Sequence, residues 1–211
     1  MITFTDYANR EEWLKGRQNT IGASEVASIL GCGFQTPLEL WKEKVGLVPH
    51  ADLSKSERVQ YGSEAEQYLR GLFALKFKDE FETTYHAYRI YRNSNYQNLH
   101  ASLDGEIRRI ADGELGILEI KSVFVNKKSD LDEWQNGVKQ AYYVQTLAQM
   151  QVLERSFAII YAEFVFPDKT SELKPYLVLR NDSDIEYITQ EVDKFMGYVK
   201  NNKQPPTTLS L

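Results

Sequence analysis

The sequence is poor in cysteine and histidine, which limits the metal chemistry open to the protein. Its 211 residues include one cysteine, Cys32, and three scattered histidines, His50, His86 and His100, which do not form a ligand motif. A single cysteine excludes an internal disulfide framework and any four-cysteine zinc or iron–sulfur site. Any metal is therefore expected to be held by oxygen ligands, which favours Mg²⁺, with Mn²⁺ as a substitute.

Long apolar runs are also absent from the sequence. No stretch approaches the roughly 20 apolar residues that a membrane-spanning helix needs. The first residues, MITFTDYANREEW, contain no apolar core of the kind that a signal peptide carries. We therefore expect a cytoplasmic protein that does not bind a membrane.

An excess of positive charge, the usual mark of a nucleic-acid-binding protein, is missing as well. The formal net charge is −5, which by itself does not suggest a nucleic-acid partner. The charge does not exclude one, because a nuclease gathers carboxylates at its active site and needs only a local basic surface to bind DNA.

What is present is the composition of an ordinary globular domain, with 42% hydrophobic and 26% charged residues. The length suits one domain over 1–211 with a sizeable core. Within it we expect N-terminal helices over 1–55, a core over 56–200 and a short tail over 201–211. Hydrophobic periodicity and turn residues predict helices at 11–18, 25–30, 37–45, 56–78, 132–153 and 183–201, and strands at 85–92, 99–108, 116–123, 156–166 and 176–180. This order predicts a mixed α/β fold with a central sheet.

The most informative local pattern joins a carboxylate at the end of one predicted strand to a Glu–Lys pair on the next. Asp104 lies in Leu103-Asp104-Gly105, and Glu119 and Lys121 lie two residues apart, so that both point to one face of their strand. Carboxylates from two adjacent strands can hold one Mg²⁺, and a nearby ammonium can orient or deprotonate a water. Metal-dependent phosphodiester hydrolysis requires such a set of groups. The alternative is a Glu–Lys pair on an exposed strand face, because Glu-x-Lys is common by chance.

Further motifs occur in a fixed order along residues 17–150. They are Arg17 with Ile21-Gly22-Ala23-Ser24-Glu25; Leu30-Gly31 and Thr36-Pro37-Leu38-Glu39-Leu40-Trp41 with Gly46; Tyr61-Gly62-Ser63-Glu64-Ala65-Glu66; Ser102-Leu103-Asp104-Gly105 with Glu119-Ile120-Lys121; and Tyr142-Tyr143-Val144-Gln145 with Gln149-Met150. Together they resemble the signature of YqaJ-like viral recombinases, relatives of lambda exonuclease in the PD-(D/E)xK nuclease superfamily. The sequence departs from that pattern at Leu103, which occupies the position of the motif's proline.

The resemblance implies a restriction-endonuclease-like α/β core, with a central mixed β-sheet flanked by helices, and roles for the residues of the Asp–Glu–Lys pattern. Asp104 and Glu119 match the metal-binding carboxylates of the family, and the carbonyl of Ile120 would complete the metal site. Lys121 matches the catalytic lysine that positions the attacking water.

Two helical motifs add further residues to this expected site. Glu66, four residues after Gly62, matches a helix carboxylate that supports a metal or its water shell. Glu64 competes for that role, although the spacing from Gly62 favours Glu66. Gln145 matches a glutamine that orients the site.

Arg17 and Ser24, seven residues apart, match the pair that holds a terminal 5′-phosphate in this family. The residues support this match independently, because Ser24 is predicted to cap a helix whose free N–H groups form an anion site, and an arginine adds a bidentate phosphate partner. The alternative is that Ser24 merely caps a helix and that Arg17 is solvated.

By this resemblance we expect a metal-dependent deoxyribonuclease that degrades one strand of linear duplex DNA, 5′ to 3′, from a 5′-phosphate end. The resulting 3′ single strands would serve phage-type recombination in a bacterial host cell. The resemblance also implies a homotrimer and a single-strand annealing protein as partner. Two alternatives remain: another PD-(D/E)xK nuclease, such as an endonuclease or junction resolvase, and a non-catalytic DNA-binding protein on a nuclease fold.

Overall fold

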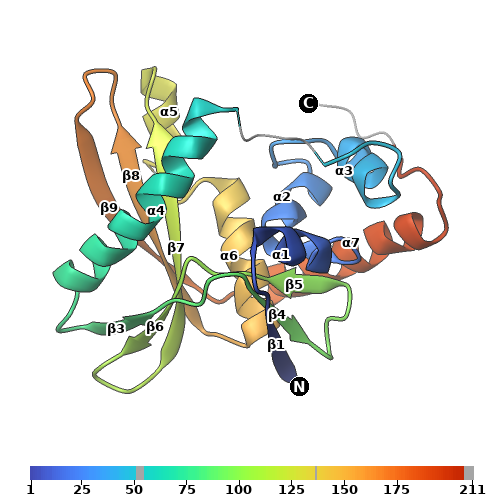
Figure 1. The fold of residues 1–211 in the computed structure, drawn as a ribbon, viewed down its shortest axis with the longest axis horizontal. Helices are drawn as coiled ribbons and strands as arrows, with labels where there is room; N and C mark the ends of the chain where they lie inside the picture. The colour runs from blue at the N-terminus through green and yellow to red at the C-terminus, as the bar shows by residue number, and fades with distance from the viewer. Residues whose placement is uncertain (51–54, 136, 207–211) are drawn as a thin grey trace.

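The strands of the protein form two separate β-sheets with helices packed around both (Figure 1). The computed structural model describes residues 1–50, 55–135 and 137–206. The larger sheet has the spatial order β3-β6-β7-β8-β9. Its strands are β3 (Phe81–Thr84), β6 (Gly105–Arg109), β7 (Leu115–Phe124), β8 (Phe157–Val165) and β9 (Ser171–Leu179).

The two longest inner strands of this sheet, β7 and β8, run parallel, whereas every other neighbouring pair in it is antiparallel. Every residue of β8 before its last, Val165, is buried. A strand covered on both faces reads as a continuous apolar run instead of an alternation of apolar and polar residues. The expected mixed α/β class, with helices flanking the sheet, is confirmed.

Helices cover the two faces of the larger sheet. The long helix α4 (Glu57–Lys76) crosses one face, and α6 (Gln140–Leu153) lies against the other (Figure 1). Because alternate residues of a strand point to opposite faces, β7 presents Leu118 to the cluster under α4 and Glu119 to α6. One face of β7 therefore contributes an apolar side chain to the interface with α4, and the other face contributes a polar one to the interface with α6.

The smaller sheet has the order β1-β4-β5-β2. Its strands are β1 (Ile2–Asp6), β4 (Arg89–Asn93), β5 (Leu99–Ala101) and β2 (Ile21–Gly22). β1 and β5 both pair antiparallel with β4, and β2 pairs parallel with β5, which sets Gly22 opposite His100. Residues near the N-terminus are thereby joined to the chain just before the Asp104 motif.

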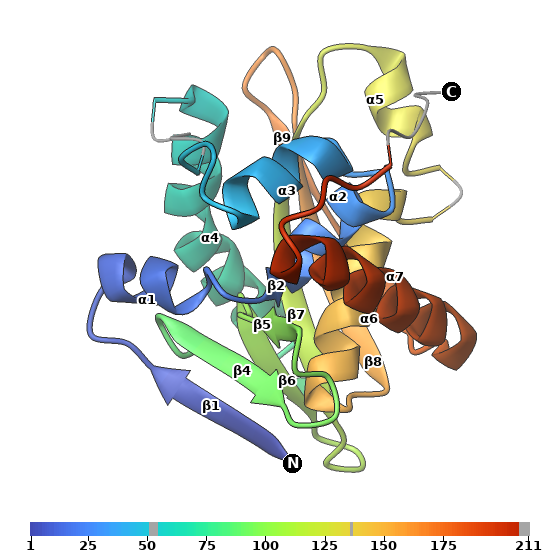
Figure 2. The same cartoon turned by 90° about the vertical axis from the view of Figure 1, so that its right-hand side faces the viewer.

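Shorter helices and one more long helix complete the described part of the chain (Figure 2). They are α1 (Arg10–Gly16), the 3₁₀ turn η1 (Ala23–Glu25), α2 (Val26–Ile29), α3 (Pro37–Lys44), α5 (Lys128–Asp132) and α7 (Asp182–Lys200). As expected, Thr36 caps α3, accepting a hydrogen bond from the Glu39 N–H at 3.3 Å, with Pro37 in the first helical turn. α2 and α7 pack against α6 through the main hydrophobic core.

The predicted strand over 99–108 was wrong as a single element. The chain forms β5 in the smaller sheet and β6 in the larger one, and Ser102-Leu103-Asp104 separates them. Gly105 begins β6 close to β7, because a Cβ there would lie 3.2 Å from the Leu118 side chain. Periodicity misses this change of sheet, because both segments have the composition of a strand.

Two other expectations need correction. The helix predicted over 132–153 begins only at Gln140, after α5 and a turn that contains Gly137 at φ +133°. Strands β1 and β3 were not expected, and the predicted loop over 47–56 lies partly outside the described residues. None of the helices described is long and apolar enough to span a membrane.

Candidate active site

The break between β5 and β6 places Asp104 beside the centre of β7. Its Oδ2 accepts a hydrogen bond from the backbone N–H of Ile120 at 2.8 Å, and Gly105 allows the close approach of the two strands. Asp104 and Glu119, which were expected to act together, are thus brought together: Asp104 directly precedes β6, and Glu119 lies on the neighbouring strand β7. Ile120, which was also expected at this site, contacts Asp104 through its backbone N–H group.

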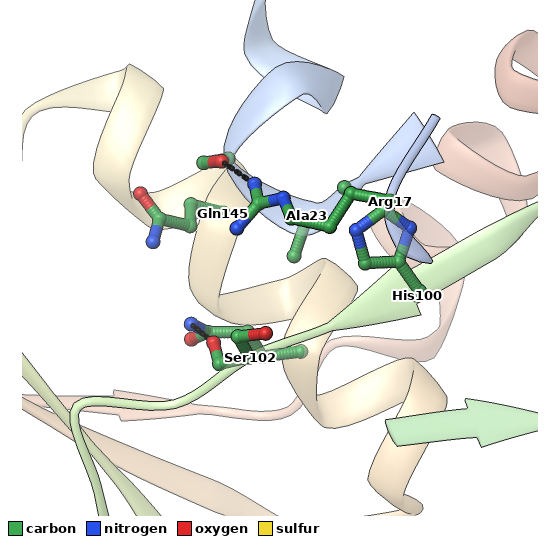
Figure 3. Close-up of a pocket in the computed structure, with 8 residues that line it drawn as sticks. Arg17, Ala23, His100, Ser102 and Gln145 are labelled. Carbon is green, nitrogen blue, oxygen red and sulfur yellow. Dashed lines mark hydrogen bonds between the residues drawn. The ribbon is translucent and has the colours of Figure 1, made fainter. Parts of the chain in front are cut away.

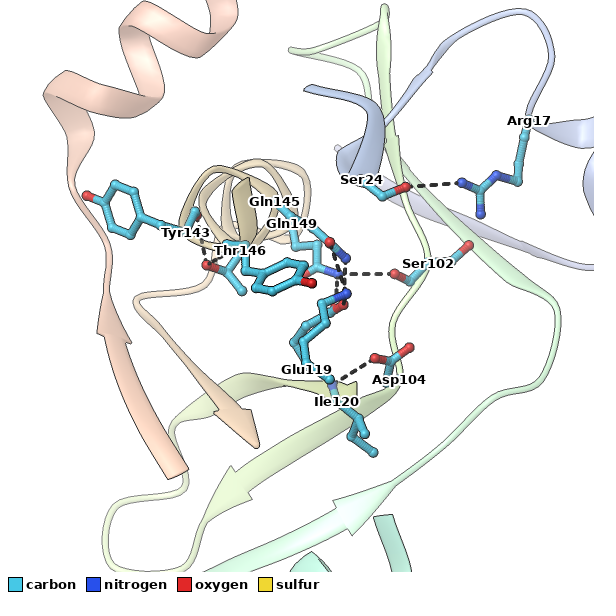
Figure 4. A network of polar contacts seen from close by, with 12 residues as sticks. Arg17, Ser24, Ser102, Asp104, Glu119, Ile120, Tyr143, Gln145, Thr146 and Gln149 are labelled. Atoms are coloured by element: carbon cyan, nitrogen blue, oxygen red, sulfur yellow. Dashed lines mark hydrogen bonds and ion pairs between the residues drawn. The ribbon is translucent and has the colours of Figure 1, made fainter. Parts of the chain in front are cut away.

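Glu119 is buried, with 2% of its surface exposed, and protein donors hold both carboxylate oxygens. Oε1 accepts from Gln145 Nε2 at 2.6 Å and lies 2.6 Å from Lys121 Nζ. Oε2 accepts from Gln149 Nε2, also at 2.6 Å (Figure 4). A buried carboxylate is costly without such partners, so these donors offset the cost of burying Glu119.

The two glutamines lie one turn apart on α6 and reach toward β7 from the same face of the helix. Gln149 also donates to the backbone carbonyl of Ser102 at 3.3 Å, which ties the helix to the break between the sheets. Gln145 was expected at this site, and Gln149 was not. The signal for it was available, because glutamines at i and i+4 on a helix that is otherwise buried need polar partners.

Lys121 lies between the carboxylates and α6. Its Nζ donates to Gln145 Oε1 at 3.2 Å in addition to its contact with Glu119. Burial lowers the pKa of Lys121, but the nearby charges of Glu119 and Asp104 outweigh burial and raise that pKa above its usual value. Lys121 is therefore a fixed cation in this arrangement.

The charges around Asp104 act against its ionised form, whereas those around Lys121 favour its ionised form. Burial, followed by the negative charges of Glu119 and Glu66, raises the pKa of Asp104 well above its ordinary value, while Lys121 and the Ile120 N–H oppose that shift. The three carboxylates are thus close enough to repel one another, with Lys121 as their central cation.

Glu66 reaches this group from α4 and is held by an arginine one turn further along. Arg70 Nη1 donates to Glu66 Oε1 at 2.9 Å and to the backbone carbonyl of Asp104 at 2.5 Å. Its guanidinium lies 3.5 Å from the ring centroid of Tyr85. Glu64 is exposed, so the geometry favours Glu66 for the helix role. Arg70 was not anticipated, although Glu66 and Arg70 have the i, i+4 spacing of a helical ion pair.

The donor set around Asp104 suits a hard divalent cation. Its side chains are oxygen ligands that together carry more negative charge than the neighbouring cations offset, and a bound cation would relieve their repulsion. Within residues 1–50, 55–135 and 137–206 no three His, Cys, Asp or Glu side chains are already arranged as a metal cluster. Both carboxylate oxygens of Glu119 accept hydrogen bonds from Gln145 and Gln149.

A small polar pocket adjoins these carboxylates. Its lining comes from the N-terminal segment, β5, the break between the sheets and α6 (Figure 3): Arg17, Gly22, Ala23, Ser24, His100, Ser102, Gln145 and Gln149. Gln145 and Gln149 line the pocket and also hold Glu119. The pocket and the carboxylate cluster are therefore two parts of one continuous site.

Arg17 and Ser24 meet in this pocket. Arg17 Nη2 lies 3.5 Å from Ser24 Oγ, and the guanidinium stacks 4.3 Å from the ring centroid of Trp13. Trp13 is in turn fixed by a 3.0 Å hydrogen bond from its Nε1 to Ser102 Oγ. The expected helix cap at Ser24 was wrong: Ser24 lies inside the 3₁₀ turn η1, and the N-cap position belongs to Gly22. An anion here would be bound by side chains, with Arg17 as the principal cation.

Residues 12–156 match the family described as YqaJ-like viral recombinase domain. The chain is also 32% identical, over 147 residues, to the uncharacterized protein YqaJ of Bacillus subtilis (strain 168). That alignment covers 69% of this chain and 43% of the relative. The chain therefore spans less than half the length of that protein.

Several solved exonucleases have a similar fold. LHK-Exo, an alkaline exonuclease from Laribacter hongkongensis, aligns with a TM-score of 0.69 at 18% identity, covering 92% of this chain and 94% of that one. LHK-Exo in complex with dAMP aligns at 0.71 and 20% identity with the same coverage. A phage related exonuclease from Haemophilus somnus 129PT aligns at 0.60 and 14% identity, covering 87% and 94%. At these identities the likeness concerns the fold.

Proposed function

Because the chain belongs to the family of YqaJ-like viral recombinase domains, we propose that it is a metal-dependent exonuclease. It removes nucleotides 5′ to 3′ from one strand of linear duplex DNA, beginning at a 5′-phosphate, and leaves 3′ single strands for recombination. The single observation that carries the proposal is the Lys121 ammonium, fixed 2.6 Å from buried Glu119 in a cluster that includes Asp104.

The metal of this proposal is Mg²⁺, for which Mn²⁺ can substitute. Asp104, Glu119 and the Ile120 carbonyl would hold it, with Glu66 supporting the ion or its water shell. When bound, such an ion polarises the phosphoryl oxygen and lowers the pKa of a coordinated water. Oxygen ligands and an excess of negative charge fit this ion better than a soft metal.

The side chains around the metal ligands have separate roles in the proposed reaction. Lys121, as a fixed cation, orients the attacking water and stabilises negative charge that develops on the phosphate. Gln145 and Gln149 keep Glu119 in one orientation through hydrogen bonds from α6. Arg70 holds Glu66 and the backbone of Asp104 at a fixed separation.

The adjoining pocket supports the proposal that the enzyme acts at ends. Arg17 and Ser24 would receive the terminal 5′-phosphate, and this group lies beside the cluster because Gln145 and Gln149 belong to both. A pocket for a phosphate monoester is useful to an enzyme that begins at a strand end, which favours an exonuclease over an endonuclease or resolvase. LHK-Exo, which has a similar fold, is known in complex with dAMP, a nucleoside monophosphate.

The assembly and the partner of the protein are also part of the proposal. By family resemblance the chain forms a homotrimer around duplex DNA, works with a single-strand annealing protein and acts inside the bacterial host cell. Sedimentation at micromolar concentration tests the first point, and a trimer is the expected result. A monomer that still digests processively would remove the ring-shaped assembly and leave the chemistry of the site unaffected.

Digestion of three end-labelled substrates tests the proposed activity. A 5′-phosphorylated linear duplex, its 5′-hydroxyl twin and a covalently closed circle are incubated with Mg²⁺ or with EDTA. We expect rapid Mg²⁺-dependent release of nucleotides from the phosphorylated linear duplex, slower release from its twin and none from the circle. Rapid cutting of the circle would show an endonuclease instead. Absence of any cleavage with Mg²⁺ or Mn²⁺ would favour a non-catalytic DNA-binding protein.

A further inference from the structure

His100 is a buried side chain of the phosphate pocket for which neither the family motifs nor the proposed chemistry accounts. It lies on β5 with 1% of its surface exposed. Its Nδ1 lies 2.8 Å from Thr20 Oγ1, whereas its Nε2 has no hydrogen-bond partner in the described part of the chain. Buried polar atoms are nearly always paired, so an unpaired one calls for an explanation.

The parallel pairing of β2 with β5 directs this ring at the pocket. Gly22 is opposite His100 in the register of the two strands, and both residues line the pocket with Arg17. Figure 3 shows the imidazole next to the Arg17 side chain. Gly22 has φ −73° and ψ 146°, an extended conformation open to any residue, so glycine is not required there by the backbone.

The space in front of Gly22 explains the glycine instead. A Cβ at Gly22 would lie 3.0 Å from Arg17 Nη2 and 3.2 Å from His100 Nε2. One nitrogen from Arg17, at the end of α1, and one from His100, on β5, therefore lie close together beside Gly22 and leave little room for a side chain there. Both residues also line the pocket, so an oxygen of an anion bound there can accept from both nitrogens.

The charge and the tautomer of His100 suit such a contact. Burial, followed by the positive charges of Arg17, Lys44 and Arg92, lowers the pKa of His100 well below its usual value. The ring is therefore neutral and carries one hydrogen. The Thr20 hydroxyl can donate to Nδ1 or accept from it, so the protein leaves the Nε2–H tautomer available.

We propose that His100 is a specificity-determining residue of the pocket, whose Nε2–H donates to an oxygen of the terminal phosphate monoester beside Arg17 Nη2. This inference rests on the proposed function, because it needs a strand end in the pocket. It adds a second, uncharged donor to the expected Arg17–Ser24 pair. It also accounts for a histidine that is buried without a partner for Nε2, and for the absence of a side chain at position 22.

Two substitutions at position 100 separate this role from that of an ordinary core histidine. In His100→Asn the amide replaces Nδ1 and keeps a partner for Thr20, but nothing reaches the Nε2 position. In His100→Gln the longer amide places an N–H near the Nε2 position. A third variant, Gly22→Ala, places a Cβ 3.0 Å from Arg17 Nη2 and 3.2 Å from His100 Nε2, so it displaces the two donors without removing either. Leu99→Ala, at a buried neighbour on β5, controls for loss of stability.

The measurement is the ratio of kcat/KM on a 5′-phosphorylated duplex to that on its 5′-hydroxyl twin. His100→Asn and Gly22→Ala are expected to lower this ratio about tenfold, the effect of one charge-assisted hydrogen bond, whereas His100→Gln and Leu99→Ala retain most of it. An unchanged ratio in His100→Asn overturns the role of His100 and leaves the proposed function standing. A wild-type ratio of one removes the pocket itself, and the role of His100 with it. An equal loss in Leu99→Ala assigns the effect to stability and also overturns the inference.

A spectroscopic measurement decides the case if the position 100 variants do not fold. The wild-type protein, labelled with ¹⁵N in its histidines, is titrated in EDTA with the short phosphorylated duplex and then with the hydroxyl twin. We expect the His100 Nε2 resonance to shift with the phosphorylated end only, in the Nε2–H tautomer. His50 and His86, which are exposed, serve as internal references. An unmoved His100 resonance, or the Nδ1–H tautomer in the bound state, would overturn the inference.

Discussion

Lys121 Nζ and Glu119 Oε1 lie 2.6 Å apart on one face of β7, in a pair that is buried on the glutamate side and partly open on the lysine side. The two residues are two positions apart on the strand, so the backbone alone aligns them. Gln145 of α6 contacts both members of the pair, and Gln149 contacts Glu119. Glu119 is thereby held in one orientation beside a protonated Lys121, and each of the following predictions depends on that arrangement or on the pocket beside it.

Replacing Lys121 with Ala should slow the chemical step about a hundredfold or more, because the fixed cation near the reacting phosphate is lost. Binding of Mg²⁺ should change little, since no ligand oxygen is removed. Single-turnover cleavage measures the first effect and isothermal titration calorimetry the second. Lys127→Ala, at an exposed lysine after β7, is the matched control. If the main loss were in Mg²⁺ or DNA affinity, the role given to Lys121 would be wrong.

Asp104→Asn should abolish cleavage and yet stabilise the metal-free protein. The pKa of Asp104 is raised well above its ordinary value. At any pH above that ordinary value, ionising Asp104 therefore costs more free energy in the folded state than in the unfolded state. Asparagine removes this charge and can still accept from the Ile120 N–H, which should add about 1 kcal/mol to the free energy of unfolding in EDTA at pH 7.

Thermal unfolding with and without Mg²⁺ completes the test of Asp104. A cation that binds only the native state raises its stability, so Mg²⁺ should raise the Tm of the wild type and leave that of Asp104→Asn unchanged. Asp112→Asn, in the turn before β7, should behave as the wild type. Near-normal turnover by Asp104→Asn at saturating Mg²⁺ would show that Asp104 is not a metal ligand. Glu119→Ala is likewise expected to abolish cleavage, and near-normal turnover by that variant would exclude Glu119.

Arg17→Ala should erase most of the preference for a 5′-phosphate end. A phosphate monoester carries close to two negative charges and a hydroxyl carries none. A charge-assisted contact in a partly buried pocket contributes roughly 1.5–3 kcal/mol, which corresponds to about a tenfold to hundredfold preference. The ratio of kcat/KM on the two linear duplexes gives the answer directly. Equal preference in the variant and the wild type would place the phosphate elsewhere.

Arg70→Lys should lower kcat about tenfold with little change in KM, because lysine keeps the positive charge but cannot hold Glu66 and the Asp104 carbonyl with the same planar group. The stacking of the guanidinium on Tyr85 is lost as well. Steady-state kinetics distinguish this from weaker substrate binding. Arg108→Lys, at an exposed arginine paired with Glu82, provides the comparison. A change confined to KM would argue for a DNA contact.

His100 should make the stability of the protein depend on pH on the acidic side of neutrality. Its pKa is lowered well below 6.5 in the folded state, so below pH 6.5 the unfolded chain binds a proton that the folded protein does not. The stabilisation is therefore complete above about pH 6.5 and is lost as the pH falls, by up to about 1.4 kcal/mol per pH unit. Urea unfolding between pH 7.5 and 5 should show a shallower loss in His100→Asn. Equal slopes would mean that His100 is protonated in the folded state.

Much of this site could be predicted from the sequence, because its chemistry is concentrated in short motifs. The Glu119–Lys121 spacing predicted two side chains on one face of a strand, and that face is the one that meets α6. The structure also brings Arg17 to Ser24, as their shared motif suggested. The Glu119–Lys121 relationship lies within one strand. The Arg17–Ser24 relationship lies within one short motif and involves an arginine, a residue type that is rarely buried without a partner.

The parts that were missed depend on contacts between distant segments. Nothing in the periodicity of 99–108 shows that the chain leaves one sheet and enters another at Ser102, because that change is set by pairing with β2 and β7. β1 was missed although its apolar and polar residues alternate, because it is a short segment and its pairing with β4, far along the chain, does not show in the sequence. The close packing of His100 Nε2 against Gly22 joins residues that are 78 positions apart in the sequence.

The three-residue break between β5 and β6 bears on the length of the product in the proposed reaction, because it sets the distance between the pocket and Asp104. Ser102 lines the pocket proposed to hold the strand end, and Asp104 is a proposed metal ligand, so two residues of continuous backbone would join the two proposed functions. Extended chain spans about 3.3 Å per residue, which fixes their separation within narrow limits. Hydrogen bonds from Trp13 and Gln149 to Ser102, and from Ile120 to Asp104, anchor both ends. In the proposed function, the break would therefore hold the residue beside the strand end at a set distance from the residue at the cleavage site.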